Sequence, residues 1–319
     1  MRVAAWQDWQ PYPPFVLRDG SAPTRTFEII PGLLDPLATL LSSRPYREID
    51  GDMICSWGPY DQCWTEAILG CRVLRAGPSV WSEPFITQWE QVDNLPPTGS
   101  QVWLDELLAV NRVLVDQVAN RYPIAQPLMR GPLDMAVAAL PSGMLYGGFY
   151  EQPKGLRTLL ELCASLFIQT AQRRLSETPP FHGGYAVRSE WGLWAPGSAV
   201  QFQADASCNV SAKTYREFLF EIDRSIASQF EYSIIHTHSA SRHILPVLVE
   251  EPELKAIEIT LDPPPYGPPP LELLPSFRIV QQAGKALFIS GPMKRFVLDS
   301  ILETLSPVGL AIRAGLLPE

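Results

Sequence analysis

The fold is decided by two stretches, AVQFQAD at residues 199–205 and YSIIHTH at residues 232–238. Each contains a short apolar run, which predicts a strand at 199–204 and at 232–235, and each run ends in polar residues. An amphipathic stretch that predicts a helix follows each of them, at 211–230 and at 241–249. Short strands that alternate with helices indicate a parallel sheet.

The same alternation extends outward in both directions. Toward the C-terminus we predict strands at 256–261, 285–290 and 310–313, and helices at 270–283 and 293–305. Toward the N-terminus we predict helices at 31–42, 60–70, 102–119, 133–140 and 155–175, strands at 52–57 and 124–129, and a loop with short turns at 78–97. The number of units and the length of 319 residues predict an α/β fold, a (β/α)8 TIM barrel over residues 51–319, with residues 1–50 as an irregular segment on or over it.

Composition narrows the class of protein. The net charge of −9 and the pI near 5.1 argue against a nucleic-acid-binding protein, which would carry a basic patch. No apolar run is long enough to span a membrane, and the N-terminal residues do not resemble a signal peptide. Five cysteines in such a chain predict reduced thiols, so we expect a cytoplasmic protein with no membrane or nucleic-acid partner.

Polar residues gather where the predicted strands end. In a (β/α)8 barrel the active site lies at the C-terminal ends of the strands. His236 and His238 are two residues apart on one predicted strand, so they share a face and can both bind one metal ion. The alternative is that one of them caps the strand end through a local hydrogen bond. Glu258 and Asp262 share a face of the next strand if that strand extends far enough.

Two further residues at strand ends have a functional and a structural interpretation. Asp205 follows the apolar strand 199–204 and is a candidate catalytic carboxylate, or it caps the turn before Ser211. Arg130 either binds a substrate carboxylate with its guanidinium, or pairs with Asp134 or Asp205 as part of the scaffold. Asp205, Arg130 and His238 are therefore the expected catalytic residues.

Two tryptophans are candidates for ligand contact. Trp191 and Trp194 lie in a loop with glycine and proline, beside the strand that ends at Asp205. A broad flat ligand would stack on such side chains. Core packing is the interpretation for most of the other tryptophans.

Several motifs in this order resemble the uroporphyrinogen decarboxylase superfamily, which also contains the corrinoid and cobamide methyltransferases. They are RGPLDM at 130–135, WAPG at 194–197, QADAS at 203–207 followed by SAKTYREF at 211–218, and HTHS at 236–239. The resemblance implies a (β/α)8 barrel whose mouth binds a tetrapyrrole, a corrinoid, or a small thiol or acid. It also implies substrate contacts at Ser207 and Asp262.

The zinc methyltransferases of this superfamily use a His-x-Cys pair and a distant cysteine. His236 matches the first position, and His238 stands where the first cysteine would be. The resemblance therefore implies zinc held by His236, His238 and a carboxylate, with Glu258 in the expected ligand set and Asp205 or Asp262 as alternatives. The chain lacks the arginine-rich N-terminal motif of true uroporphyrinogen decarboxylases, which argues against four-fold decarboxylation of uroporphyrinogen.

Three functions follow as hypotheses. The first is metal-assisted methyl transfer between a small acceptor and a corrinoid, with a corrinoid protein as a candidate partner and a homodimer as a candidate assembly. The second is a metal-free decarboxylase of a porphyrinogen or a small acid, in which Asp205 stabilises a protonated intermediate and Arg130 holds a carboxylate. The third is a tetrapyrrole-binding protein without catalysis.

Overall fold

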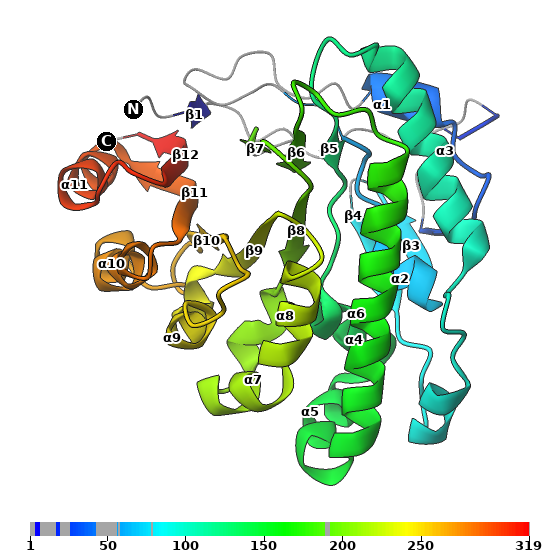
Figure 1. Ribbon diagram of the computed structural model, residues 1–319. Coiled ribbons are helices and arrows are strands. Elements are labelled where there is room, and N and C mark those ends of the chain that lie inside the picture. Colours follow the sequence, from blue (N-terminus) through cyan, green and yellow to red (C-terminus); the bar gives the residue numbers. More distant parts are fainter. Residues whose placement is uncertain are drawn as a thin grey trace. The chain divides into compact units, whose positions relative to one another are not determined.

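The computed structural model describes residues 4–6, 17–19, 26–42, 56, 58–77, 79–188 and 192–318. The chain divides into two compact units (Figure 1). Unit 1 comprises residues 1–9, 47–54 and 199–319, and unit 2 comprises residues 10–46 and 55–198. The predicted boundary at residue 50 falls outside the described residues.

Unit 1 is built on a parallel sheet of six strands in the order β1-β12-β11-β10-β9-β8 (Figure 1). From β8 to β12, strands that are consecutive along the chain are neighbours in the sheet, and β1 pairs with β12. The strands are β1 (Ala4–Trp6), β8 (Ala199–Gln203), β9 (Tyr232–His238), β10 (Ala256–Thr260), β11 (Ala286–Lys294) and β12 (Leu310–Leu317).

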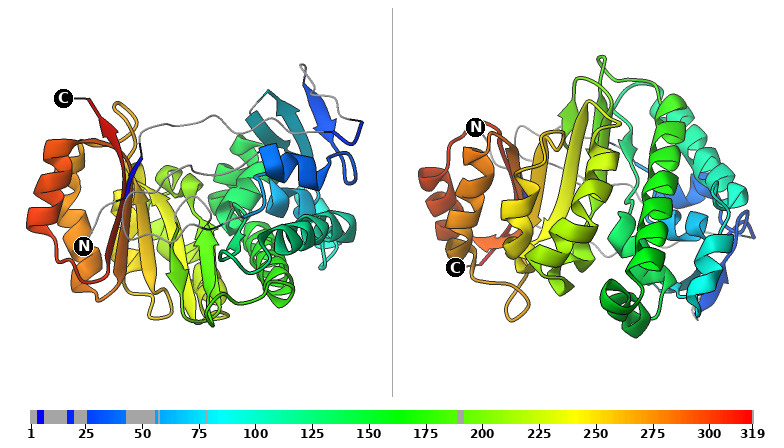
Figure 2. Two further views of the ribbon diagram at one scale, coloured as in Figure 1. Left: turned by 90° about the horizontal axis from the view of Figure 1, so that it is seen from above. Right: turned by 60° about the horizontal axis from the view of Figure 1, so that its bottom comes forward.

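The connections of unit 1 are helical, and Figure 2 shows its helices alongside the sheet. Crossovers between sequential parallel strands are right-handed, so helices between strands in sequential order pack on one face. Contacts of α8 with β9, of α10 with β11 and of α11 with β11 and β12 agree with this placement. The elements are η2 (Asp205–Asn209), α7 (Ala212–Phe218), α8 (Phe220–Ala227), η3 (Ser239–Ile244), α9 (Leu245–Leu248), η4 (Pro270–Leu273), α10 (Leu274–Gln282) and α11 (Arg295–Thr304).

The two faces of this sheet differ in chemistry. Residues paired across a parallel sheet point to the same face, and successive residues alternate between faces. Apolar residues such as Phe202, Ile235 and Ile257 occupy one face, and Phe202 lines a small cavity together with residues of α7 and α8. The opposite face carries two polar rows, one of Gln203, His236 and Glu258, and one of His238, Thr260, Ser290 and Arg313.

Unit 2 is mainly helical and contains two small sheets. One sheet is antiparallel in the order β2-β3-β4, and in the other β5 pairs parallel with β6, which pairs antiparallel with β7. The strands are β2 (Phe27–Ile29), β3 (Arg72–Ala76), β4 (Ser79–Glu83), β5 (Ala125–Gln126), β6 (Tyr185–Arg188) and β7 (Trp194–Ala195). The helices are α1 (Pro36–Ser42), α2 (Trp64–Leu69), η1 (Trp89–Asn94), α3 (Gln101–Val118), α4 (Pro132–Ala139), α5 (Ser142–Glu151) and α6 (Pro153–Ser176).

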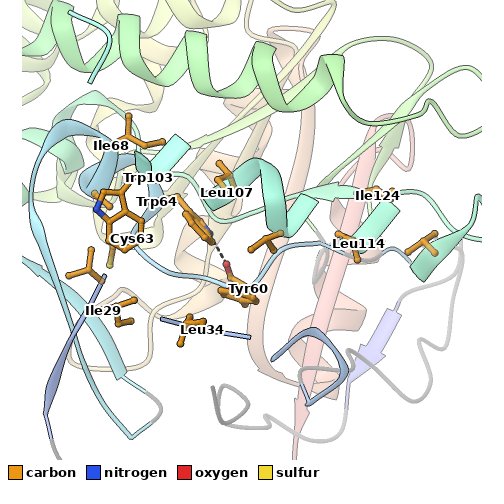
Figure 3. Close-up of a cluster of buried hydrophobic side chains, with 14 residues drawn as sticks. Ile29, Leu34, Tyr60, Cys63, Trp64, Ile68, Trp103, Leu107, Leu114 and Ile124 are labelled. Atoms are coloured by element: carbon orange, nitrogen blue, oxygen red, sulfur yellow. Dashed lines mark hydrogen bonds between the residues drawn. The ribbon is translucent and has the colours of Figure 1, made fainter. Parts of the chain in front are cut away.

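A buried cluster around two tryptophans forms part of the core of unit 2 (Figure 3). The rings of Trp64 and Trp103 meet edge to face with centroids 6.2 Å apart. The indole nitrogen of Trp64 donates a hydrogen bond of 2.8 Å to the carbonyl of Tyr60, so its polar atom is satisfied inside the core. Ile29 and Leu34 join residues of α2 and α3 in the same cluster, which ties the N-terminal segment of unit 2 to its helices.

The predicted (β/α)8 barrel is wrong. The described strands form three sheets, of six, three and three strands. The sheet of six is open, because β8 forms one edge, β1 forms the other, and no described strand pairs them. Alternation of strands and helices is a local property, whereas closure depends on the number and stagger of all strands.

Some of the predicted helices and strands are confirmed, and others differ from the structure. The helices predicted at 102–119, 133–140 and 155–175 are confirmed as α3, α4 and α6. The helix predicted at 211–230 is two helices, α7 and α8, which meet at Leu219. The strand predicted at 124–129 has only two residues, and most of the strand predicted at 52–57 lies outside the described residues.

Among the helices of the described residues, none combines the length and the apolar character that crossing a bilayer requires.

Candidate functional site: a two-histidine, one-carboxylate cluster

The candidate site lies in unit 1, where β8, β9 and β10 end. Asp205 begins the short helix η2 directly after β8, and His236 and His238 lie near the end of β9. The register places His236 between Gln203 of β8 and Glu258 of β10. Because side chains alternate along a strand, His236 and His238 point to the same polar face.

Three side chains converge on one point. The Nε2 atom of His236 lies 3.1 Å from Oδ1 of Asp205, and the Nε2 atom of His238 lies 3.7 Å from the same oxygen. One possible ligand atom from each of the three residues lies within 4.8 Å of those of the other two. Tetrahedral ligands at zinc bond lengths stand about 3.4 Å apart. The two measured distances bracket this value.

A second carboxylate stands behind each histidine. The Nδ1 atom of His236 forms a short contact with Oε2 of Glu258, and Nδ1 of His238 lies 2.6 Å from Oδ1 of Asp262. A carboxylate at Nδ1 holds the imidazole in the tautomer that carries its lone pair on Nε2, the nitrogen that faces Asp205. Both rings are therefore oriented for metal binding through Nε2. Glu258, expected as a metal ligand, lies at the opposite nitrogen of His236, and Asp205 lies at the ligand position.

Glu258 is itself held by hydroxyl groups of β9, β10 and β11. Its Oε1 accepts a hydrogen bond of 2.8 Å from the hydroxyl of Thr260 and a short one from the hydroxyl of Ser290. The hydroxyl of Thr237 donates to its backbone carbonyl at 2.9 Å. Both carboxylate oxygens are thus used, as a buried carboxylate requires, and the position of His236 is tied to β10 and β11.

Asp262 connects the loops that follow β9 and β10. Its Oδ2 accepts hydrogen bonds from the hydroxyl of Ser239 at 2.8 Å and from the backbone N–H of Ala240 at 3.2 Å. Its own N–H donates to Ser239 at 3.0 Å. Gly267 packs so closely that an added Cβ would lie 2.6 Å from the Cβ of Asp262 and 2.5 Å from the hydroxyl of Ser239.

The electrostatics of the cluster favour a cation. Burial disfavours a charged imidazole at His236, but the carboxylates of Glu258 and Asp205 outweigh it and raise the pKa of His236 to about 10. The hydrogen bond with Asp262 raises the pKa of His238, against the effect of burial. Burial also opposes ionisation of Asp262, yet the bonds from His238 and its neighbours lower its pKa. These shifts show a site in which positive charge is stabilised.

Exposure increases from the back of the site to its front. The side chain of Glu258 is fully buried, and that of His236 is 7% exposed. The side chains of His238 and Asp205 are 31% and 38% exposed. The ligand-facing side of the cluster is therefore accessible, while the carboxylate that supports His236 is not.

The other predicted site residues have different surroundings. Arg130 belongs to unit 2, where it pairs with the buried carboxylate of Glu66 and lies 3.4 Å from the sulfur of Cys63. Attraction to Glu66, which outweighs burial, raises the pKa of Arg130. Sequence reasoning considered Asp134 and Asp205 as ion-pair partners but not Glu66. The expected catalytic role of Arg130 stays a prediction.

Ser207 and the two tryptophans are the remaining predicted contacts. Ser207 is fully buried, and its hydroxyl contacts the carbonyl of Ala204 and the hydroxyl of Ser241 at 2.9 Å, which fixes the turn that carries Asp205. Trp194 belongs to unit 2 and donates its indole N–H to the carbonyl of Phe181 at 3.0 Å. Trp191 lies outside the described residues. Their contacts with substrate stay predictions.

Sequence reasoning missed the hydroxyls of Thr260 and Ser290. The alternation of side chains along β10 and β11 would have found them, because each is paired across the sheet in the row of His238.

The comparisons with known proteins assign no family. No protein-family model matches this sequence, and the search of curated proteins finds no match.

Proposed function

We propose that this protein is a metal-dependent enzyme in which Asp205, His236 and His238 hold one zinc ion. The observation that carries the proposal is the convergence of two Nε2 atoms on one oxygen of Asp205, each with a carboxylate at its Nδ1 atom. Three protein ligands leave a fourth position for water or substrate, which is the arrangement of catalytic zinc sites.

The chemistry of the ligands also supports a catalytic role. Two neutral imidazoles and one carboxylate leave the ion more Lewis-acidic than several thiolates would. A bound zinc ion would lower the pKa of a thiol or water at the open position. His236 and His238 would position that ligand, and Glu258 and Asp262 would retain the protons on the Nδ1 atoms.

The specific reaction that we propose is methyl transfer between a corrinoid and a small thiol or acid, as the sequence resemblance implies. With a thiol acceptor, the sulfur forms a bond to the methyl carbon as the cobalt–carbon bond breaks. The electron pair of that bond stays on cobalt, and the thiol proton leaves to solvent. His236 and His238 keep the acceptor beside the exposed side of the cluster, and Asp205 contributes negative charge there.

Metal analysis tests the proposal directly. We expect about one zinc per chain in the purified protein, and loss of the ion in the variant His236→Ala/His238→Ala. His182→Asn is the matched control, because His182 is an exposed histidine of unit 2 with a positive φ that asparagine tolerates. Loss of zinc in the double variant with retention in the control supports the site.

The assay for the reaction uses methylcobalamin and small thiols. Zinc-dependent loss of the methylcobalamin spectrum supports methyl transfer. Bound zinc without transfer would retain the metal site and overturn this reaction. If neither the purified nor the zinc-loaded protein contains metal, the metal site is wrong, and a metal-free decarboxylase or a tetrapyrrole-binding protein becomes the better hypothesis.

A further inference from the structure

Gln203 is a buried amide beside the candidate metal ligands. Gln203 is only 4% exposed, and its side-chain Oε1 accepts no hydrogen bond within the described part of the chain. A buried acceptor without a partner costs about 1–3 kcal/mol. Such an atom in a native structure is commonly satisfied by a ligand or by an ordered water.

Gln203 lies beside the metal ligands in the sheet. Gln203 is paired with His236 across β8 and β9, so the two side chains share the polar face on neighbouring strands about 4.8 Å apart. It also lies two residues before Asp205, and the N–H of the residue between them, Ala204, donates to the carbonyl of His236 at 3.0 Å. A small ligand bound at the open metal position would lie within reach of this amide.

Charge indicates which kind of group the amide would meet. The site contains three carboxylates, from Asp205, Glu258 and Asp262, which outweigh one divalent ion when both imidazoles are neutral. A cationic or neutral hydrogen-bond donor is favoured in this field over an anion. Arg313 is on the same polar face but three strands from His238, about 14 Å by strand spacing, beyond the reach of a short ligand at the metal.

We infer that Gln203 accepts a hydrogen bond from an amine on the ligand that binds the metal. The substrate class is then a small donor ligand, such as a thiol, that carries an ammonium group two or three bonds from its metal-binding atom. This inference rests on the proposed metal site and adds to it the identity of the group that distinguishes one small ligand from another.

Three thiols of similar length test the inference: cysteamine, 2-mercaptoethanol and 3-mercaptopropionate. Each is titrated into the cobalt(II)-loaded protein, and thiolate binding is followed by its charge-transfer absorbance. The quantity compared is the affinity ratio of cysteamine to 2-mercaptoethanol in the original protein and in Gln203→Leu. Because the thiols of cysteamine and 2-mercaptoethanol differ in acidity by the same amount in both proteins, this difference cancels when the two affinity ratios are compared. We expect the ratio to fall about tenfold in the variant, with 2-mercaptoethanol affinity nearly unchanged.

Two further variants make the test specific. Gln201 lies two residues before Gln203 on the same face of β8 and is paired with Ile234 instead of His236. The variant Gln201→Leu should therefore leave the affinity ratio unchanged. Gln203→Glu adds a charge at the same position and should increase the ratio, which provides a second test if Gln203→Leu fails to fold. Melting curves report folding for each variant.

The outcomes separate the inference from the function on which it rests. An unchanged ratio in Gln203→Leu and Gln203→Glu, with cobalt still bound, overturns the role of Gln203 and leaves the metal site intact. Tightest binding of 3-mercaptopropionate also overturns it and indicates that the ligand meets a cationic group instead of the amide. Failure of the protein to bind cobalt or zinc overturns both proposals.

Discussion

Glu258 connects the buried interior of unit 1 to the exposed cluster of ligands. Its carboxylate is fully buried, and burial of an ion is unfavourable unless hydrogen bonds and charges compensate for it. His236, Thr260 and Ser290 supply those contacts. The same contacts prevent the imidazole of His236 from rotating. Glu258 does not face the metal-binding position itself, yet it controls the orientation of His236, which does.

The change Glu258→Gln tests this role. The variant keeps the shape of the side chain but removes the charge that orients His236. We expect zinc affinity to fall about 10–100-fold without disappearing, as is typical for partners of metal-binding histidines. Competition with a chromophoric chelator measures the change. Glu253→Gln is the control, because Glu253 is an exposed carboxylate that pairs with Lys255, and unchanged affinity in both variants would contradict the assignment.

Zinc affinity should depend on pH through the two histidines. Without metal, the pKa of His236 is raised to about 10, so its charged form predominates at neutral pH, and the pKa of His238 is raised as well. Zinc needs the neutral imidazoles and must displace those protons. Affinity should therefore increase as pH rises from about 6 to about 8, and weaken as pH falls. Calorimetric titration in buffers of different ionisation enthalpy should detect proton release, and binding without it would contradict the proposed ligands.

At the scale of single elements, β9 shows what the sequence predicts and what it does not. Its apolar start was predicted, but the strand continues through His236, Thr237 and His238. Polar side chains normally indicate the end of a buried strand, and here neighbouring carboxylates and hydroxyls compensate for their burial. The pair of histidines and the group of carboxylates were foreseen from spacing. Which carboxylate faces which nitrogen depends on the register of three strands, a non-local property.

The loop after β10 should be coupled to the metal ligands through Gly267. In Gly267→Ala the new methyl would collide with Asp262 and Ser239, so Asp262 must move and release its hold on His238. We expect weaker zinc binding and a lower melting temperature, measured by chelator competition and calorimetry. Gly143→Ala is the matched control, because its methyl meets no atom within 4 Å in helix α5, and it should stabilise the protein by about 0.5–1 kcal/mol. Normal zinc affinity in a folded Gly267→Ala protein would contradict the coupling.

At the scale of the whole molecule, the error in the predicted barrel has a definite cause. The consecutive units from β8 to β12 were recognised because each carries its own apolar strand and amphipathic helix. In unit 2, β5 and β7 have only two residues each, and β7 runs antiparallel to β6. Local periodicity cannot report strand order or direction, so extension of the regular C-terminal pattern over the whole chain was not justified.

Arg130 provides a test that separates the two units. In Arg130→Met the buried carboxylate of Glu66 loses its counter-ion, which should destabilise the protein by about 3–5 kcal/mol. The double variant Glu66→Gln/Arg130→Met should recover most of this stability. Zinc affinity should stay unchanged in both, because the ligands belong to unit 1. Denaturant unfolding and zinc titration provide the two readouts, and weaker zinc binding in the stable double variant would contradict the separation.

The pairing of β1 with β12 has a consequence for how the protein is made. These two strands lie side by side in the sheet, yet about 300 residues separate them along the chain. At ordinary ribosomal speeds of about 5–20 residues per second, β12 is translated roughly 15 to 60 seconds after β1, and among the described strands β12 is the one that pairs with β1. During this interval β1 has no sheet to join, while the intervening residues of unit 2 emerge in one continuous stretch from residue 55 to residue 198. Unit 2 is therefore expected to mature first on the ribosome, and the metal-binding unit to be completed only after β12 has been synthesised.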